Sequence, residues 1–161
     1  KKMKKKITIF FTILFLILLD IIISKYFTIH TIKLNLWLVY ILFACLFLGH
    51  TDAVLLGFFC GMILDILHMS IFGINTFVLT TIGYFFGWLY KHIDESLLKV
   101  QGIVLFLGSV LYLGLVFIIS KLFSIPISFS YITFFTPFLD LFLGFILMRI
   151  FILCYEKLGI I

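Results

Sequence analysis

Charge and cysteine are both scarce in this chain. Only 12% of its 161 residues are charged and only three are cysteines, whereas about a quarter of the residues of a soluble domain are charged. So few charges cannot cover a soluble surface, and they argue against a nucleic-acid-binding module, a disordered chain or a disulfide scaffold. The cysteines, Cys45, Cys60 and Cys154, lie in apolar stretches without a CxxC spacing, which is typical of buried thiols.

Apolar residues are abundant instead. They make up 65% of the chain, with 22 phenylalanines and a mean hydropathy of +1.35. Within a bilayer, helices of about 20 residues are the segments that satisfy their own backbone hydrogen bonds. We therefore predict an all-α integral membrane protein that is in contact with membrane lipids and binds no nucleic acid.

The net charge of +5 lies mostly at the N-terminus. The cluster consists of Lys1, Lys2, Lys4, Lys5 and Lys6. Basic residues beside a span tend to stay in the cytoplasm and to attract anionic head groups. Together with the apolar run that follows they resemble a signal peptide, but Asp20 interrupts that run and no small-x-small cleavage pattern follows. We therefore expect an uncleaved first span.

The remaining charges delimit six apolar stretches, which predict a six-helix bundle forming a single transmembrane domain over residues 1–161. The expected spans are about 7–24, 34–49, 53–68, 71–90, 100–120 and 131–155. An even number of spans places both termini on one side of the membrane. With the N-terminus inside, the cytoplasmic set is Lys1, Lys2, Lys4, Lys5, Lys6, Lys91, Lys99 and Lys157, against Lys25, Lys33 and Lys121 outside. This bias predicts that both termini are cytoplasmic.

A polar triplet, His50-Thr51-Asp52, separates the second and third expected spans. We interpret it as a tight turn between two short helices. His50 and Asp52 could also touch a metal ion, but two ligands make a weak site, so the turn is the favoured interpretation.

Ionisable residues inside the spans are costly to bury, and each needs a reason. They are Asp20, Asp65, Asp140 and Arg149. Asp65 follows Gly57 and Gly61 at four-residue spacing, so all three lie on one helical face. Two such glycines allow a neighbouring backbone to come close, and the aspartate can accept a hydrogen bond across the contact. We predict a packing seam that ends in a polar contact; the alternative is a carboxylate that binds a substrate or ion.

The next span repeats this spacing with Gly83 and Gly87, after a turn that contains Gly73 and Asn75. Gly73 suits a turn with positive φ, and Asn75 is a candidate cap for the helix that follows.

The last expected span contains Asp140 and Arg149, nine residues apart and thus on nearly opposite faces, so they cannot simply pair. Each needs a partner on another helix or subunit, or lies near an interface. Pro137 fits the first turn of this helix. Asp20 is expected near the outer head groups, or in a polar contact with another span.

Catalytic patterns are missing. Asp65 follows Met62-Ile63-Leu64 rather than the Gly-x-Gly of an intramembrane aspartyl protease, no serine lies in Gly-x-Ser-x-Gly, and no cysteine has a histidine at a readable spacing. We predict a protein that is not an enzyme and has no catalytic, metal or cofactor site.

The stretches GFFCGMILD at 57–65, ILHMSIFGIN at 66–75 and IGYFFG at 82–87 resemble the central signature of the rod shape-determining protein MreD family. In that family a glycine-rich helix ends in an aspartate, a turn with glycine and asparagine follows, and a Gly-Tyr helix leads to a basic cytoplasmic loop. The length, basic N-terminus, six expected spans and proline in the last helix are also similar.

This resemblance implies a non-enzymatic, multi-pass subunit of the bacterial inner membrane that belongs to the cell-elongation complex for peptidoglycan synthesis. The implied partners are MreC, the MreB filament, the RodA glycosyltransferase and a class B penicillin-binding protein. It further implies that the bundle holds the transmembrane helix of MreC, with Gly57, Gly61 and Asp65 either shaping the bundle or contributing to the docking surface.

A rival hypothesis is the substrate-binding S-component of an energy-coupling factor vitamin transporter, which is similar in layout. Those proteins usually carry small residues four apart in the first helix, where the energising subunit packs. The first span here contains no glycine or alanine, and Thr8 and Thr12 are the nearest approximation. The expected outer loops also offer few polar groups for a hydrophilic vitamin.

Overall fold

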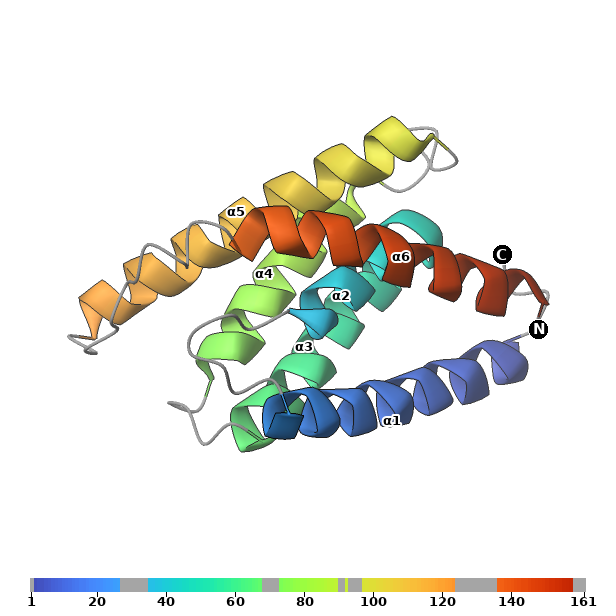
Figure 1. The fold of residues 1–161 in the computed structure, drawn as a ribbon, viewed down its shortest axis with the longest axis horizontal. Helices are drawn as coiled ribbons and strands as arrows, with labels where there is room; N and C mark the ends of the chain where they lie inside the picture. Colours follow the sequence, from blue (N-terminus) through green and yellow to red (C-terminus); the bar gives the residue numbers. More distant parts are fainter. Residues whose placement is uncertain are drawn as a thin grey trace.

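The computed structural model describes residues 2–26, 35–67, 73–89, 92, 97–123 and 136–157. Within these residues the chain is all-helical and forms six helices (Figure 1). They are α1 (Lys2–Tyr26), α2 (Leu36–Phe47), α3 (His50–Leu67), α4 (Ile74–Gly87), α5 (Leu98–Leu122) and α6 (Thr136–Lys157). The predicted all-α class and six-helix bundle are thus confirmed.

Three of the helices are long and apolar enough to cross a membrane, namely α3, α5 and α6. The other three contain shorter apolar segments, Ile7–Ile22, Leu36–Phe47 and Ile74–Gly87. Parts of the expected spans, residues 34, 68, 71–72, 90 and 131–135, lie outside the described residues. The described helix α6 begins at Thr136-Pro137, where the proline's missing N–H costs no helical hydrogen bond.

The turn between α2 and α3 differs from the expectation. It is made by Leu48 and Gly49, whereas His50, Thr51 and Asp52 already belong to α3. Gly49 has a φ of 111°, which glycine adopts readily and which reverses the chain in very few residues. Asp52 then lies in the first turn of α3, where a negative charge is favourable beside the exposed N–H groups.

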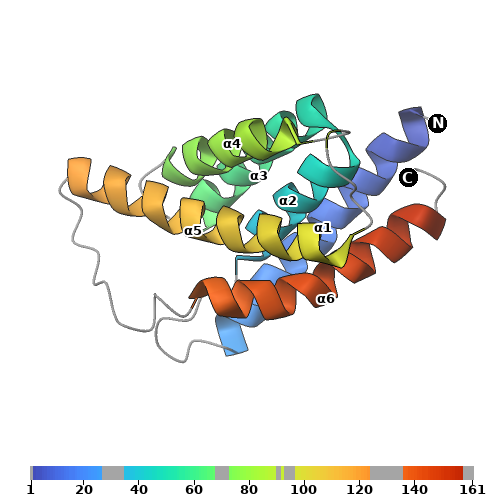
Figure 2. The ribbon, with the colours of Figure 1, turned by 90° about the horizontal axis from the view of Figure 1, so that it is seen from above.

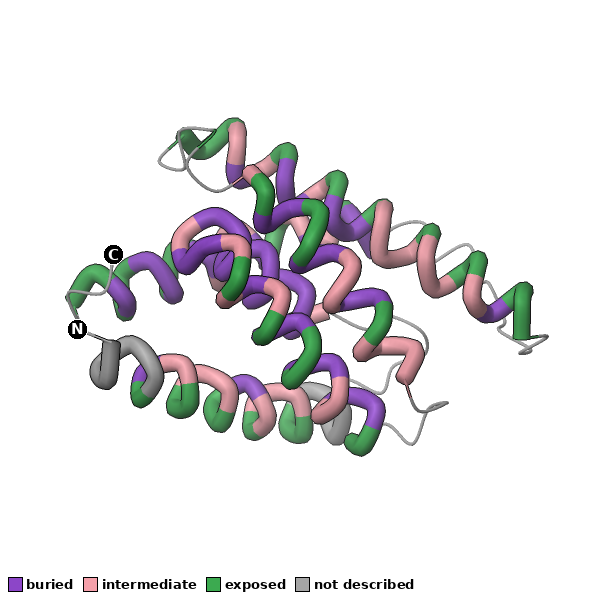
Figure 3. The backbone as a smooth tube through the Cα atoms, turned by 180° about the vertical axis from the view of Figure 1, so that it is seen from behind, coloured by how far each residue is buried: buried purple, intermediate pink, exposed green. Residues whose placement is uncertain are grey.

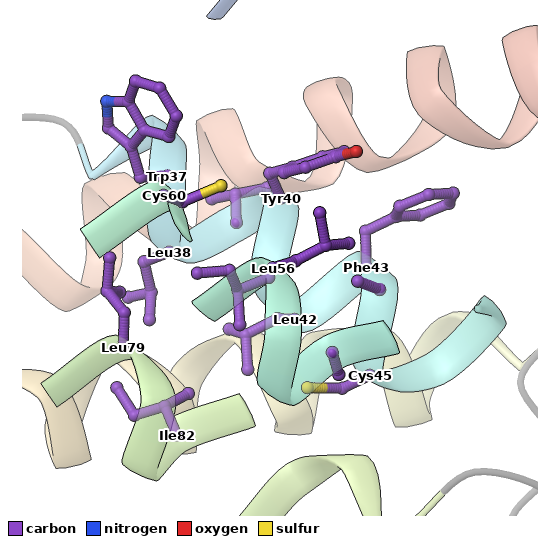
Figure 4. Packing of buried hydrophobic residues seen from close by; sticks show 14 of the residues in the cluster. Trp37, Leu38, Tyr40, Leu42, Phe43, Cys45, Leu56, Cys60, Leu79 and Ile82 are labelled. Carbon is purple, nitrogen blue, oxygen red and sulfur yellow. The ribbon is translucent and has the colours of Figure 1, made fainter. Parts of the chain in front are cut away.

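Helix α2 occupies the centre of the bundle. All of its residues except Phe47 are buried, as the continuous purple tube in Figure 3 shows. A helix that is apolar on every side is buried among other helices or in lipid, and α2 is buried among other helices. In Figure 4, Leu38 and Leu42 of α2 point toward Leu79 and Ile82 of α4. On another side, Phe43 lies against Tyr155 of α6, with ring centroids 5.1 Å apart.

Helix α1 lies on the periphery. Of its described side chains only Thr8 and Leu16 are buried, and the outward ones form an apolar surface that suits lipid. Figures 1 and 2 both place the first turns of α1 and the last turns of α6 at the same end of the molecule. The last turns of α5 extend beyond α2 and α4 in both views.

Candidate functional site: a glycine seam and the polar network beside it

Helices α3 and α4 contact each other through backbone atoms, and glycines on both sides make this possible. A Cβ added to Gly57 would lie 2.6 Å from the carbonyl oxygen of Leu79, and one added to Gly83 would lie 2.7 Å from that of Ala53. Real Cβ atoms essentially never come this close, so larger residues at either position require the helices to separate.

The other two glycines extend this contact. A Cβ on Gly61 would collide with the backbone of Thr76 and lie 2.7 Å from its nitrogen, and one on Gly87 would lie 2.9 Å from Nδ1 of His50. Gly57 and Gly61 of α3 therefore face α4, while Gly83 and Gly87 of α4 face α3. We call these four residues the glycine seam. All four are buried.

Asp65 lies at the end of the seam, where it caps the N-terminus of α4. Its Oδ2 accepts hydrogen bonds from the backbone N–H of Gly73 at 2.9 Å, the N–H of Thr76 at 3.1 Å and the Thr76 hydroxyl at 2.6 Å. Its Oδ1 accepts from the N–H of Asn75 at 3.1 Å and from its side-chain amide at 2.9 Å. The first N–H groups of a helix have no partner within the helix, and one carboxylate satisfies three of them here.

The turn before α4 explains why this cap comes from the preceding helix. Gly73 holds the N-cap position with a φ of 103°, as predicted for a turn glycine, and it has no side chain to accept a hydrogen bond. Asn75 was predicted to cap α4 and does not, because it lies inside the helix and donates to Asp65. The negative carboxylate is also favourable at the positive end of the α4 dipole.

The network continues from α4 to α5 through Asn75. The hydroxyl of Tyr112 donates to Oδ1 of Asn75 at 3.2 Å. The amide of Asn75 therefore joins Asp65 on α3 to Tyr112 on α5, using its donor side for the first and its acceptor side for the second.

A second carboxylate extends the connections to α6 and α2. Asp140 is buried on α6, and it accepts a hydrogen bond from the Ser109 hydroxyl of α5 at 2.7 Å. It also accepts one from the backbone N–H of Asn35, just before α2, at 3.3 Å. Ser109 is three residues before Tyr112 and thus on the same face of α5. Asp65, Asp140 and these donors therefore link α2, α3, α4, α5 and α6, and we call them the carboxylate network.

Helix α1 is joined to the bundle by hydroxyl groups. Thr12 lies 2.9 Å from the hydroxyl oxygen of Tyr40 on α2 and 3.2 Å from that of Tyr155 on α6, and the two tyrosine oxygens are 3.1 Å apart. Thr12 also donates to the carbonyl oxygen of Ile9. We call Thr12, Tyr40 and Tyr155 the hydroxyl cluster.

Asp20 and Arg149 are the other two ionisable residues that were predicted to lie inside the spans. Asp20 is partly exposed on α1, and Arg149 is exposed on α6, on the side opposite the buried Asp140. The sequence thus placed Asp140 and Arg149 on different faces, and the structure does the same.

The chemistry of these groups is that of hydrogen-bond acceptors held by neutral donors. Asp65 accepts at least five hydrogen bonds, which leaves its oxygens committed to α4. Among the described residues, no group of three or more histidine, cysteine, aspartate or glutamate side chains could hold a metal ion. The arrangement is therefore suited to fixing helices relative to one another.

A family model described as rod shape-determining protein MreD matches residues 2–159. The chain belongs to the MreD family. This family determines the rod shape of cells and is a structural family, and together with the three apolar helices the match shows a membrane protein of the cell-shape system. No curated protein and no solved structure matches the chain.

The stretches that resemble the MreD signature correspond to the glycine seam and the Asp65 cap, apart from residues 68–72, which lie outside the described part of the chain. Sequence reasoning missed Tyr112, Ser109 and the hydroxyl cluster. A polar residue on an apolar helix was the available signal, because hydroxyl groups in such helices seek partners on neighbouring helices.

The hydroxyl cluster can be tested with the change Tyr155→Phe. This change removes one of three mutually bonded hydroxyls while Thr12 and Tyr40 stay in contact, so we expect a loss of about 1 kcal/mol in the free energy of unfolding. Thermal unfolding in detergent, followed by circular dichroism, measures it. The matched control is Tyr84→Phe, which removes an exposed hydroxyl. Equal melting temperatures for the two variants would show that the cluster does not stabilise the bundle.

Proposed function

We propose that this chain is a non-enzymatic, multi-pass subunit of the bacterial cell-elongation complex in the inner membrane. In this role it docks the transmembrane helix of MreC and helps to organise the RodA glycosyltransferase and a class B penicillin-binding protein, together with the MreB filament. The observation that carries the proposal is the family match over residues 2–159, which leaves almost none of the chain outside the family model.

The topology that we propose has both termini in the cytoplasm. The basic cluster at residues 1–6 and the last turns of α6 support it, because the first turns of α1 and the last turns of α6 lie at the same end of the molecule (Figure 1). Six helices that each cross the bilayer also place both ends on one side.

The glycine seam is proposed to shape the bundle rather than to contact the partner. Its four residues are buried between α3 and α4, so a partner helix cannot reach them while the two helices stay together. Asp65 and Asp140 contribute in the same way by fixing the order of five helices. The docking surface then lies on outward faces, where the rigid bundle presents apolar side chains to lipid or to another helix.

Co-purification tests this function. When the tagged chain and MreC are expressed together and extracted in a mild detergent, we expect MreC to be retained in a stable complex. The control is an unrelated, untagged single-span membrane protein with a span of the same length, which is expressed together with the tagged chain and should be washed away. Failure to retain MreC above this control would contradict the proposal. Uptake of a vitamin by cells that carry the chain with an energising module would instead favour the transporter hypothesis.

A further inference from the structure

Between Phe142 and Leu153, helix α6 has an outward face that is apolar except for one charge, and Glu156 and Lys157 follow on the same side at the end of the helix. This face, which we call the α6 outer stripe, consists of Phe142, Ile146, Arg149, Ile150 and Leu153. Phe142, Ile146, Arg149 and Leu153 recur every three or four residues, as expected for one side of a helix, and Ile150 lies at the edge of this side, four residues after Ile146. The inward side of α6 carries the buried residues Asp140, Gly144, Met148 and Tyr155. Arg149 thus projects away from the bundle, between apolar side chains of which Ile146 and Ile150 are 50% and 46% exposed.

Arg149 makes no ion pair or hydrogen bond with the residues that the structure describes. A charged side chain at the depth of an apolar helix is costly unless it has a partner, so the stripe as it stands is energetically incomplete. Arginine presents a planar fork of donors that binds a carboxylate through two parallel hydrogen bonds. The complementary group is therefore an acidic one.

A lipid phosphate at the end of the helix is a poor match for this position. The nearer end of α6 is Lys157, eight residues away, which corresponds to about 12 Å along the helix axis. Helical Cα–Cβ bonds tilt toward the N-terminus, so the side chain of Arg149 leaves the backbone in the direction away from that nearer end.

A second copy of this chain does not match either. Two copies with the same orientation in one membrane are related by an axis along the membrane normal, and a symmetric contact through α6 would bring both Arg149 residues to the same depth. Two arginine side chains that face each other at the same depth repel each other. The occupant must therefore be a different helix that carries an acidic residue.

We propose that the α6 outer stripe docks a transmembrane helix of the partner subunit, and that an aspartate or glutamate of that helix pairs with Arg149. This inference rests on the proposed function, because it assumes a membrane-spanning partner. Ile146, Ile150 and Leu153 supply close packing on the same face, which drives helix association where lipid provides no hydrophobic gain. The ion pair sets the register of the two helices.

Co-purification of MreC tests whether the positive charge of Arg149 is needed for docking. We expect Arg149→Glu to lower the amount of MreC that co-purifies with the full chain about tenfold or more, and Arg149→Lys to retain most of it. Lys121→Glu is the matched control, because it makes the same reversal of charge at an exposed position of α5 and should leave capture unchanged. Exchange of the partner's acidic residue for arginine should restore binding to Arg149→Glu, which excludes misfolding of that variant as the cause.

Cys154 provides a positional test. It lies exposed on α6, one turn after Ile150 of the stripe, whereas Cys45 and Cys60 are buried. Single cysteines placed along the partner's helix should form a disulfide with Cys154 on one face of that helix, near its acidic residue. The crosslink should be lost with Arg149→Glu.

The outcomes separate the two proposals. Equal capture of MreC by wild type, Arg149→Glu and Lys121→Glu overturns the docking role of the α6 outer stripe and leaves the proposed function standing. A partner helix without an acidic residue near the crosslinked position has the same consequence. The docking role is also overturned if Arg149→Glu binds less phosphatidylglycerol in vesicles than wild type does, while its capture of the partner is unchanged. Absence of any capture by wild type overturns both proposals.

Discussion

Replacing Asp65 by alanine is expected to lower the free energy of unfolding by about 3 kcal/mol or more. The change removes the acceptor of three backbone N–H groups at the start of α4 and of the side chains of Asn75 and Thr76. These donors are half-buried, and a half-buried donor without a partner recovers only part of its hydration. Thermal unfolding in detergent measures the loss, and a lower yield of folded protein should accompany it.

The change Asp65→Asn separates the charge from the acceptor. An asparagine oxygen can still accept from Asn75, but its amide group then faces the donors of Gly73 and Thr76, so we expect it to recover only part of the lost stability. The control is Glu156→Ala, which removes an exposed carboxylate near the end of α6 and should shift stability by less than about 0.5 kcal/mol. Wild-type stability in Asp65→Asn would show that the carboxylate is not the cap of α4.

The helical spacing of Gly57, Gly61 and Asp65 was sufficient to predict a seam and a polar contact at its end. Residues four apart lie on one face, and glycine permits a close approach whichever helix is the neighbour. The number and class of the helices were also predictable, because few charges interrupt the apolar stretches. These inferences use only local spacing, which sequence contains directly.

The helix boundaries and the long-range hydrogen-bond partners could not be predicted from the sequence. A polar triplet suggested a turn at residues 50–52, but the turn depends on the positive φ of Gly49, which no pattern of polarity records. Tyr112 pairs with Asn75 across 37 positions of the sequence, and Ser109 pairs with Asp140 across 31. Periodicity identifies which face of a helix is buried, but it does not identify which other helix lies opposite.

Replacing Gly61 by alanine is the second large change that we expect, with a loss of about 1 to 3 kcal/mol in the free energy of unfolding. The added Cβ meets the Cα and nitrogen of Thr76, and backbone atoms cannot rotate aside as a side chain can. The helices α3 and α4 must therefore separate, which weakens both the seam and the hydrogen bonds from the start of α4 to Asp65. Thermal unfolding in detergent measures the effect, as for Asp65.

Two other glycines provide graded controls for Gly61→Ala. At Gly102 an added Cβ would lie 3.2 Å from a ring atom of Phe145, which can shift, and at Gly114 it would meet nothing within 4 Å. Gly102→Ala should therefore cost little, and Gly114→Ala should be neutral or stabilise the helix by up to about 1 kcal/mol, because alanine favours helix more than glycine does. From the most to the least stable variant, the order should be Gly114→Ala, then Gly102→Ala, then Gly61→Ala. If Gly61→Ala is as stable as Gly114→Ala, backbone contact between α3 and α4 is not what the glycine seam provides.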